Sequence, residues 1–300
     1  MKLVGKLRVC ATPIGNLEDI TLRVLQALRE ADLIAAEDTR HTRKLLSAYE
    51  IHRPLTSYHE HNKKAKGQEI ANKIAEGATV VLVSDAGLPG ISDPGEELVG
   101  LCIERGLLVE VLPGPSASLT ALVLSGLPTS RFVFEGFLPR QKKAYRERLE
   151  ELAKEERTMI LYESPHRVKA TLQDLQKLLG DQRPVALIRE LTKKFEEVRR
   201  GTIGSLLEAM TEPIKGECTL VVGGSPKEQE HLIAQSYDEE SLSELLFQEI
   251  EAFMAEGIDH KEALKKGAHK LGLPKREAYR LKLLYEEKKK YQGDGSDPSP

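Results

Sequence analysis

The chain has 300 residues, of which 40% are hydrophobic and 30% are charged, and its net charge is −3. This length predicts two or more domains that each bury a core, and the composition excludes fibrous and wholly disordered proteins. The three cysteines, Cys10, Cys102 and Cys218, lie far apart without a CxxC pair. Their spacing argues against a disulfide framework or a cysteine-based zinc site and favours a reducing compartment.

No segment has the pattern of a signal peptide or a membrane span. Charges at Lys2, Lys6 and Arg8 interrupt the apolar stretch that a signal peptide needs. The longest uncharged run, 111–130, contains three prolines and two glycines, which predicts a strand, turns and a helix instead of a membrane helix. We therefore expect a cytoplasmic protein.

Charge is distributed unevenly along the chain. Residues 261–290 contain eleven Lys or Arg and four Glu, a net charge of +7, so the rest of the chain carries −10. This asymmetry predicts a basic C-terminal module that binds a polyanionic partner.

Hydrophobic periodicity in the first part of the chain alternates between strands and helices. Apolar runs predict strands at 7–12, 33–36, 79–83 and 107–112. Amphipathic spacing predicts helices at 21–31, 39–48, 62–76, 96–105 and 116–124. This alternation is typical of a mostly parallel sheet covered by helices.

The pattern beyond the turn at 126–128 is less regular. Strands are predicted near 132–135, 158–162, 185–191, 196–201 and 218–222. Adjacent strands without a helix between them indicate a mixed sheet, so the predicted fold class is α/β with two α/β domains. Helical spacing from residue 241 and a turn at 272–274 resemble a small helix-turn-helix module. The predicted boundaries are 1–127 and 128–224 for the two domains, 225–239 for a linker, 240–290 for the basic helical module and 291–300 for a disordered tail.

Three irregular loops follow strands of the first predicted sheet, at 12–16, 84–95 and 113–118. The middle loop is unusually rich in Gly, Pro, Ser and Asp, and such a loop exposes backbone groups to a ligand. Its Asp85 and Asp93 are suited to bind hydroxyls or a cation. Turn geometry alone also explains the first loop, and helix capping by Ser116 explains the third. Because all three converge on one sheet edge, together they predict a ligand cleft.

Several familiar motifs are absent from the sequence. It has no GxGxxG, no GxxxxGK[ST] and no GxSxG, so dinucleotide binding, P-loop nucleotide binding and a hydrolase triad are unsupported. His52, His59 and His61 lie near one another, but without a Cys partner or HExxH we interpret them as loop histidines and expect no metal.

Polar clusters follow strands at 36–43, 162–167 and 189–193, and the two in the second domain can face the first domain's loops across a cleft. In the first cluster, Asp38 or Thr39 is equally suited to cap the next helix. In the C-terminal module, Lys275, Arg276 and Arg280 fall away from the apolar helix face and form a possible phosphate-contacting surface. A solvated basic helix explains the same pattern.

Taken together, the motifs ATPIGNLEDITLR, AEDTRHTRKLL, VSDAGLPGISDPG, PGPSA, FEGFLPR, YESPHR and RELTKKFEEVRRG closely resemble the bacterial ribosomal RNA small subunit methyltransferase I family. This family lies within the tetrapyrrole-methylase-like enzymes that use S-adenosylmethionine. The resemblance covers about residues 7–223, and the basic module at about 240–288 also matches.

The resemblance implies a homodimer with S-adenosylmethionine in a cleft between two α/β domains and no metal. It implies 2′-O-methylation of a cytidine ribose in the decoding region of 16S rRNA in the small ribosomal subunit. By position it assigns these residues to the donor pocket: Pro13, Ile14, Ser84, Asp85, Ala86, Gly87, Ile91, Ser116, Ala117 and Tyr162. Candidates for the base are Asp38, Glu163 and Glu190, and Arg40 or Arg189 is a candidate for positioning phosphate.

Two rival functions remain open on the sequence. One is methylation of a tetrapyrrole ring carbon, and the other is a non-catalytic RNA-binding assembly factor. The basic module and the YESPHR and RELTK segments favour RNA over a tetrapyrrole, and the intact loop set opposes loss of turnover.

Overall fold

A computed structural model describes residues 5–225, 238–255, 257–271, 273 and 277–285. The chain divides into two compact units, Met1–Gly223 and Gly224–Pro300. Nearly all of the predicted linker and the whole predicted tail lie outside the described residues.

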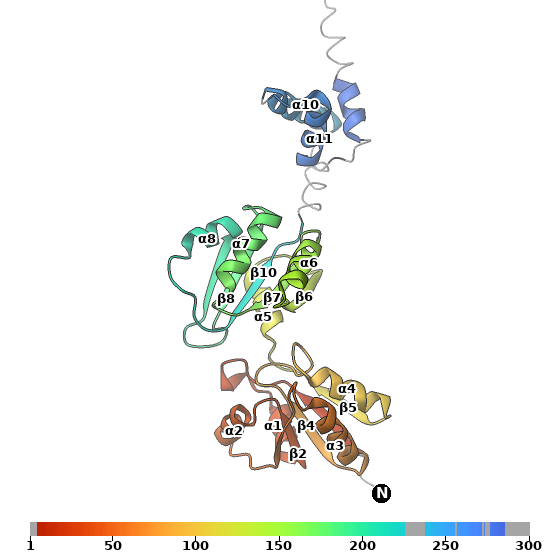
Figure 1. The fold of residues 1–300 in the computed structure, drawn as a ribbon, viewed down its shortest axis with the longest axis vertical. Helices are drawn as coiled ribbons and strands as arrows, with labels where there is room; N and C mark the ends of the chain where they lie inside the picture. Colours follow the sequence, from red (N-terminus) through yellow and green to blue (C-terminus); the bar gives the residue numbers. More distant parts are fainter. Residues whose placement is uncertain (1–4, 226–237, 256, 272, 274–276, 286–300) are drawn as a thin grey trace, which may run out of the picture. The chain divides into compact units, whose positions relative to one another are not determined.

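The first unit begins with a sheet of five parallel strands in the order β3-β2-β4-β1-β5 (Figure 1). Its strands are β1 (Lys6–Cys10), β2 (Leu33–Ala36), β3 (Leu55–Ser57), β4 (Thr79–Val83) and β5 (Leu108–Leu112). Its helices are α1 (Leu22–Glu30), α2 (Thr39–Ala48), α3 (Lys63–Ala75) and α4 (Gly95–Glu104), with a short 3-10 turn, η1 (Leu17–Asp19).

Alternation along the buried strand β4 shows how both faces of this sheet are covered. Val81 and Val83 belong to the core under α1, whereas Val80 and Leu82 belong to the core under α3 and α4. Because successive side chains of a strand point to opposite faces, a central parallel strand is apolar throughout. The predicted parallel sheet with helices on it is therefore confirmed, although the three-residue edge strand β3 was not predicted.

The second sheet is mixed, as predicted, with the order β6-β7-β10-β8-β9. β6 and β7 are parallel, and the other neighbours are antiparallel. Its strands are β6 (Phe132–Phe137), β7 (Thr158–Glu163), β8 (Pro184–Arg189), β9 (Glu197–Thr202) and β10 (Cys218–Val222). Its helices are α5 (Ala117–Ser125), α6 (Lys142–Leu152), α7 (Val168–Leu179) and α8 (Ile203–Ala209).

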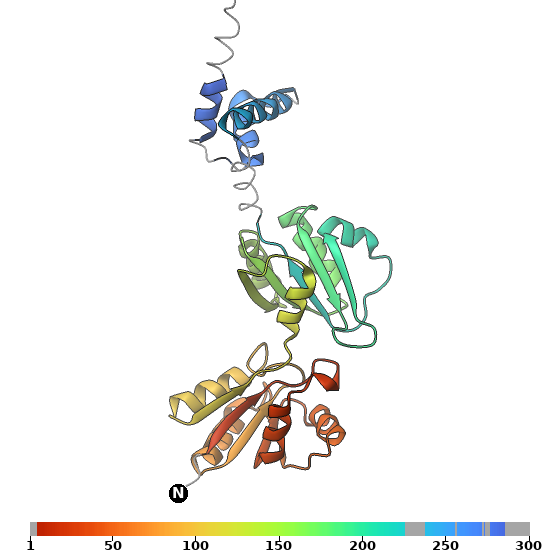
Figure 2. The same cartoon turned by 180° about the vertical axis from the view of Figure 1, so that it is seen from behind.

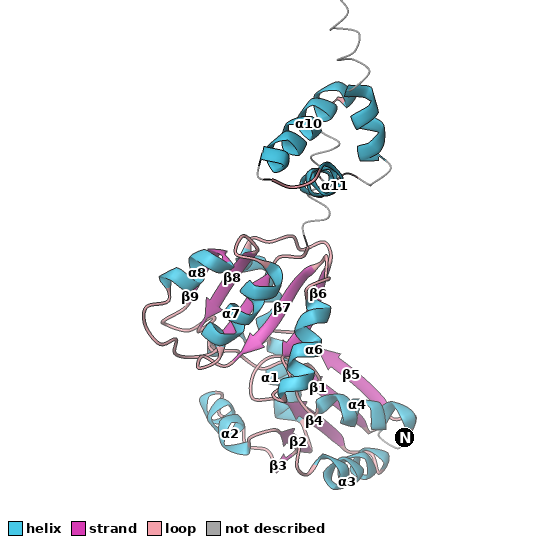
Figure 3. Cartoon of the chain, turned by 45° about the horizontal axis from the view of Figure 1, so that its top comes forward, coloured by secondary structure: helices cyan, strands magenta, loops and turns pink. Residues whose placement is uncertain are grey.

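Helix α5 precedes the second sheet in sequence but packs on that sheet, as the view from behind shows (Figure 2). Its Ala121 and Leu122 lie in one buried cluster with Ile160, Ile188 and Val221. The opposite face of the same sheet carries α6, α7 and α8 (Figure 3). The chain thus passes from one sheet to the other at 113–116, before the boundary predicted at 127, because the apolar face of α5 matches the second sheet.

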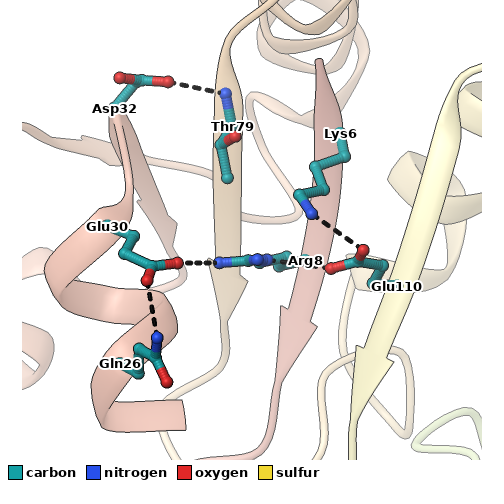
Figure 4. A network of polar contacts seen from close by, with 7 residues as sticks. All are labelled: Lys6, Arg8, Gln26, Glu30, Asp32, Thr79 and Glu110. Atoms are coloured by element: carbon teal, nitrogen blue, oxygen red, sulfur yellow. Dashed lines mark hydrogen bonds and ion pairs between the residues drawn. The ribbon is translucent and has the colours of Figure 1, made fainter. Parts of the chain in front are cut away.

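A network of ion pairs ties together the amino-terminal half of the first sheet (Figure 4). Arg8 on β1 reaches Glu110 on β5 and Glu30 on α1, each at 2.9 Å, and Lys6 reaches the same Glu110 at 2.9 Å. Lys6 and Arg8 lower the pKa of Glu110 by hydrogen bonding to it. These contacts join β1 to β5 and to α1.

The second unit contains α10 (Glu239–Ala255), α11 (His260–Lys270) and a helix at 277–285. The three helices share one apolar core that includes Leu246, Ile250, Leu264 and Leu281. Within the described part of the chain, no helix is both long and apolar enough to cross a membrane.

Candidate active site

Two loops meet at the point where the first sheet reverses its winding. β1 and β4 are neighbours, yet β1 is followed by α1 on one face and β4 by α4 on the other. The two loops are joined by a bridge in which the Thr12 amide donates to the Gly87 carbonyl (2.8 Å) and the Gly87 amide donates to the Thr12 carbonyl (3.0 Å). Ligands of open α/β sheets bind at such a switch point, beyond the carboxyl ends of the strands.

A cavity of about 770 Å³ lies at this edge, and residues from both sheets line it. Nine of the ten predicted donor residues line it, namely Ile14, Ser84, Asp85, Ala86, Gly87, Ile91, Ser116, Ala117 and Tyr162, and Pro13 does not. The loops after β1, β4 and β5 therefore do converge, and the second sheet closes the opposite wall with Tyr162, Ile188 and Leu191.

Aromatic rings make one wall of the cavity largely apolar. The Tyr162 ring meets Phe134 and Phe137 edge to face, with centroids 5.1 Å and 5.6 Å apart. Burial raises the pKa of Tyr162, and its hydroxyl is hydrogen-bonded to Ser118 at the start of α5. The phenol is therefore neutral, and this wall suits a flat, uncharged ring.

The opposite corner of the cavity is acidic. Glu37, Asp85 and Asp93 all line it. The Asp93 carboxylate accepts hydrogen bonds from the amides of Gly90 (2.8 Å) and Gly95 (2.7 Å), which shapes the long loop. Burial raises the pKa of Glu37, and the negative charges of Asp85 and Asp93 raise it further. Such a cluster attracts a cationic ligand group. Burial also raises the pKa of Asp93, but its carboxylate is held by the two loop amides, whereas Glu37 is a candidate for proton exchange.

Glu37 was not among the predicted catalytic residues, although it directly precedes one of them. Asp38, its neighbour, caps α2 by accepting from the Arg40 amide and pairs with the Arg40 guanidinium at 2.6 Å. These hydrogen bonds hold the pKa of Asp38 well below its usual range. Neither Asp38 nor Arg40 lines the cavity, so helix capping, the alternative interpretation of this segment, accounts for Asp38.

Of the two predicted carboxylates in the second sheet's loops, Glu163 lines the cavity and Glu190 does not. Glu163 is buried and accepts hydrogen bonds from the Ser164 amide (2.8 Å) and the Thr171 hydroxyl (2.7 Å). Glu190 accepts from the Glu217 amide and from Lys193, each at 3.0 Å, and these contacts lower its pKa. Glu190 therefore ties β8 to the 215–217 turn.

The turn after β8 packs closely against the loop after β1. A Cβ on Gly15 would lie 2.6 Å from Lys193 Cγ, 2.7 Å from Thr192 Oγ1 and 2.8 Å from the Leu191 carbonyl oxygen. Thr192 itself has φ of 64°, a conformation that non-glycine residues adopt at a cost. Only glycine fits at position 15, and this contact holds Ile14 and Leu191 on the cavity wall.

The remaining predictions concern histidines and RNA. The rings of His59 and His61 have centroids 6.0 Å apart, and among the described residues no group of three or more His, Cys, Asp or Glu side chains is arranged to hold a metal. Arg280 pairs with Glu239 at 2.7 Å and Glu277 at 2.9 Å, so two carboxylates balance its charge. Lys275 and Arg276 lie outside the described residues.

Residues 6–207 match the family model of tetrapyrrole (corrin/porphyrin) methylases, the class of protein that this two-sheet fold and its cavity define. Proteins named ribosomal RNA small subunit methyltransferase I are similar over most of the chain. The one from Halalkalibacterium halodurans is 49% identical over 92% of this chain and 94% of its own length, and the one from Bacillus subtilis is 47% identical over 92% and 93%. The chain therefore belongs to the ribosomal RNA small subunit methyltransferase I family, and the resemblance expected from its motifs is confirmed.

Solved structures show the same fold at low sequence identity. A diphthine synthase matches with a TM-score of 0.57 and 16% identity over 73% of this chain and 90% of its own. Uroporphyrin-III C-methyltransferase from Thermus thermophilus, in a structure with S-adenosylhomocysteine, matches with a TM-score of 0.52 and 20% identity over 73% and 97%. The fold is thus that of the tetrapyrrole methylases, as expected.

Proposed function

We propose that this chain transfers a methyl group from S-adenosylmethionine to the ribose 2′-oxygen of a cytidine in the decoding region of 16S rRNA. The observation that carries this proposal is the close similarity to proteins named ribosomal RNA small subunit methyltransferase I over more than 90% of the chain. The cavity at the meeting point of the three loops supports the transferase part, because it offers one place for a donor and an acceptor.

The residues of the cavity fit this donor. Its volume of about 770 Å³ lies in the range of small-molecule sites, about 300–1,000 Å³. The wall made by Phe134, Tyr162 and Leu191 suits an adenine ring, and the corner with Glu37 and Asp85 suits the positive amino and sulfonium groups.

When bound, S-adenosylmethionine supplies a methyl group that is already activated by the sulfonium charge. The task of the protein is to align the ribose hydroxyl with that group, and alignment contributes up to about 7–11 kcal/mol in ideal cases. A ribose hydroxyl is a weak nucleophile, so a residue that accepts its proton adds about 10²–10⁴-fold. We assign this role to Glu37, because it lines the cavity, its pKa is raised, and the other cavity carboxylate with a raised pKa, Asp93, is held by the amides of Gly90 and Gly95.

We further propose that the protein acts as a homodimer in the cytoplasm, on small ribosomal subunits. Helix α5 leaves Leu119 50% and Val123 73% exposed, and Phe132 on β6 is 38% exposed. Leu119 and Phe132 also line the cavity, so a second copy packed on this surface would help to enclose it. Sedimentation equilibrium of the wild type and of Val123→Glu tests this, because the charged variant is expected to be monomeric.

The transfer itself is tested with methyl-labelled S-adenosylmethionine and small ribosomal subunits from cells that lack the enzyme. We expect label in the RNA of these subunits and none in subunits that already carry the modification. Donor binding without RNA labelling would favour the tetrapyrrole reaction, and absence of donor binding would favour the assembly factor.

A further inference from the structure

A second cavity, of about 490 Å³, adjoins the donor cavity. Residues from the end of β6, the start of α6 and the start of α7 line it. It shares Phe137, Glu163 and Ser164 with the donor cavity, so the two spaces are neighbours along one wall.

Three cations and two aromatic rings line this second cavity, and its two carboxylates, Glu163 and Asp174, are paired with Arg167 and Lys177. Arg140 and Lys142 are exposed, and neither makes an ion pair with a carboxylate of the described residues. Arg167 lies over the Tyr145 ring, 5.6 Å from its centroid, and 3.6 Å from Glu163. The cavity therefore presents two cations without a carboxylate partner, Arg140 and Lys142. Two aromatic rings lie in the same lining, and one of them, Phe137, is 62% exposed.

Two other cations on α6 have carboxylate partners. Arg148 on α6 pairs with Glu135 and Glu151 at 2.5 Å, and Lys143 lies 3.8 Å from Glu147.

Proteins commonly bind single-stranded nucleic acid with unpaired cations next to aromatic rings. The cations contact phosphate, and the rings stack on bases.

We propose that this second cavity binds the nucleotide next to the one that is methylated, with Arg140 and Lys142 on its phosphate and Phe137 and Tyr145 against its base. This inference rests on the proposed function. A ribose whose 2′-oxygen enters the donor cavity remains joined through phosphate to its neighbour, and the second cavity is an adjoining space for that neighbour. Phe137, Glu163 and Ser164 line both cavities, and the second cavity also contains the unpaired cations Arg140 and Lys142.

The test compares two double variants on α6 and the segment before it. Arg140→Gln with Lys142→Gln removes both free cations, and Lys143→Gln with Arg146→Gln removes the same charge from exposed positions that do not line the cavity. With small subunits from cells that lack the enzyme, we expect the first variant to raise KM about tenfold and to lower the log–log salt slope by about 1 to 2, at unchanged kcat. The control is expected to stay within about twofold of the wild type.

Titration with S-adenosylhomocysteine is expected to give the wild-type Kd for both variants. Equal KM and salt slope for wild type and the Arg140/Lys142 variant would overturn the inference while the proposed function stands, as would an equal loss in the control. If the wild type methylates no RNA, the proposed function fails. Binding of a fluorescein-labelled oligocytidylate to the wild type and the two variants then tests the nucleotide subsite by itself. Weaker binding confined to the Arg140/Lys142 variant would support the subsite, and equal binding would overturn it.

Discussion

At the residue scale, two neighbouring carboxylates have opposite environments. Asp38 caps a helix and pairs with Arg40, which keeps it ionised and outside the cavity. Glu37 lines the cavity, where burial and the charges of Asp85 and Asp93 raise its pKa. This difference makes Glu37 the stronger candidate for accepting a proton, although the two residues look alike in sequence.

Replacing Glu37 by Gln is expected to lower the single-turnover rate by about 10²-fold or more, with donor affinity within a few-fold of the wild type. Because the ionised form acts as the base, the wild-type rate should rise with pH as Glu37 loses its proton. Rates measured from acid to neutral pH check both points. Asp38→Asn is the matched control, since Asn caps helices as well as Asp. An equal rate loss in both variants would contradict the assignment.

Glu37→Gln is also expected to change the stability of the protein. The folded pKa of Glu37 lies above its ordinary value of 4.5, so folding favours the protonated form. Wild-type stability therefore falls as pH rises from about the unfolded value through the raised folded value. Glu37→Gln escapes this loss, and we expect a higher Tm than the wild type at neutral pH and a smaller difference in acid. A difference that grows as pH falls would refute this.

At the element scale, contact between the loop after β1 and the turn after β8 holds the cavity walls together. Gly15→Ala is expected to destabilise the protein by about 1–3 kcal/mol, because the added methyl group meets Thr192 and the Leu191 backbone. It should also weaken donor binding, since Ile14 moves from the cavity wall. Chemical denaturation and donor titration measure the two effects.

Gly100→Ala in the middle of α4 is the control for this substitution. Nothing lies within 4 Å of its added Cβ, so we expect a gain of about 0.5–1 kcal/mol and unchanged donor binding. Equal behaviour of the two alanine variants would mean that the contact at Gly15 does not position the cavity wall.

Sequence patterns predicted most elements of the two sheets because period and capping are local properties. The helix at 39–48 was predicted with the bounds that α2 has, and β4 likewise. The three-residue strand β3 is too short for periodicity to register. The packing of α5 on the second sheet depends on contacts with β8 and β10, distant in sequence, so strand and helix alternation assigned it to the wrong sheet.

Some features of the candidate site were also predictable from the sequence, and others were not. Loops after strands identified the cavity walls, because the carboxyl ends of parallel strands share one edge. Which acidic side chain faces the cavity depends on the turn between β2 and α2, and the pattern AEDTR does not specify it. The pairing of Glu190 with Lys193 and the Glu217 amide likewise becomes visible only in three dimensions.

At the scale of the whole molecule, the first unit contains the entire cavity, and the second contains a separate helical core. Each unit thus has a buried core of its own.

A chain that ends at Ser225 is therefore expected to fold cooperatively and to bind S-adenosylhomocysteine with the affinity of the full chain. Its affinity for small subunits should be lower and less dependent on salt, because it lacks the basic module with Lys275 and Arg276. Calorimetry and subunit binding at several salt concentrations check this. An unchanged salt slope would remove the module from RNA binding.

The most direct test of the account is the position of the methyl group. RNA from small subunits methylated in vitro is digested with nucleases, and the labelled product is identified by mass spectrometry. We predict one cytidine that carries the methyl group on its ribose 2′-oxygen. A methyl group on a base, or several labelled nucleotides without preference, would contradict the proposed reaction.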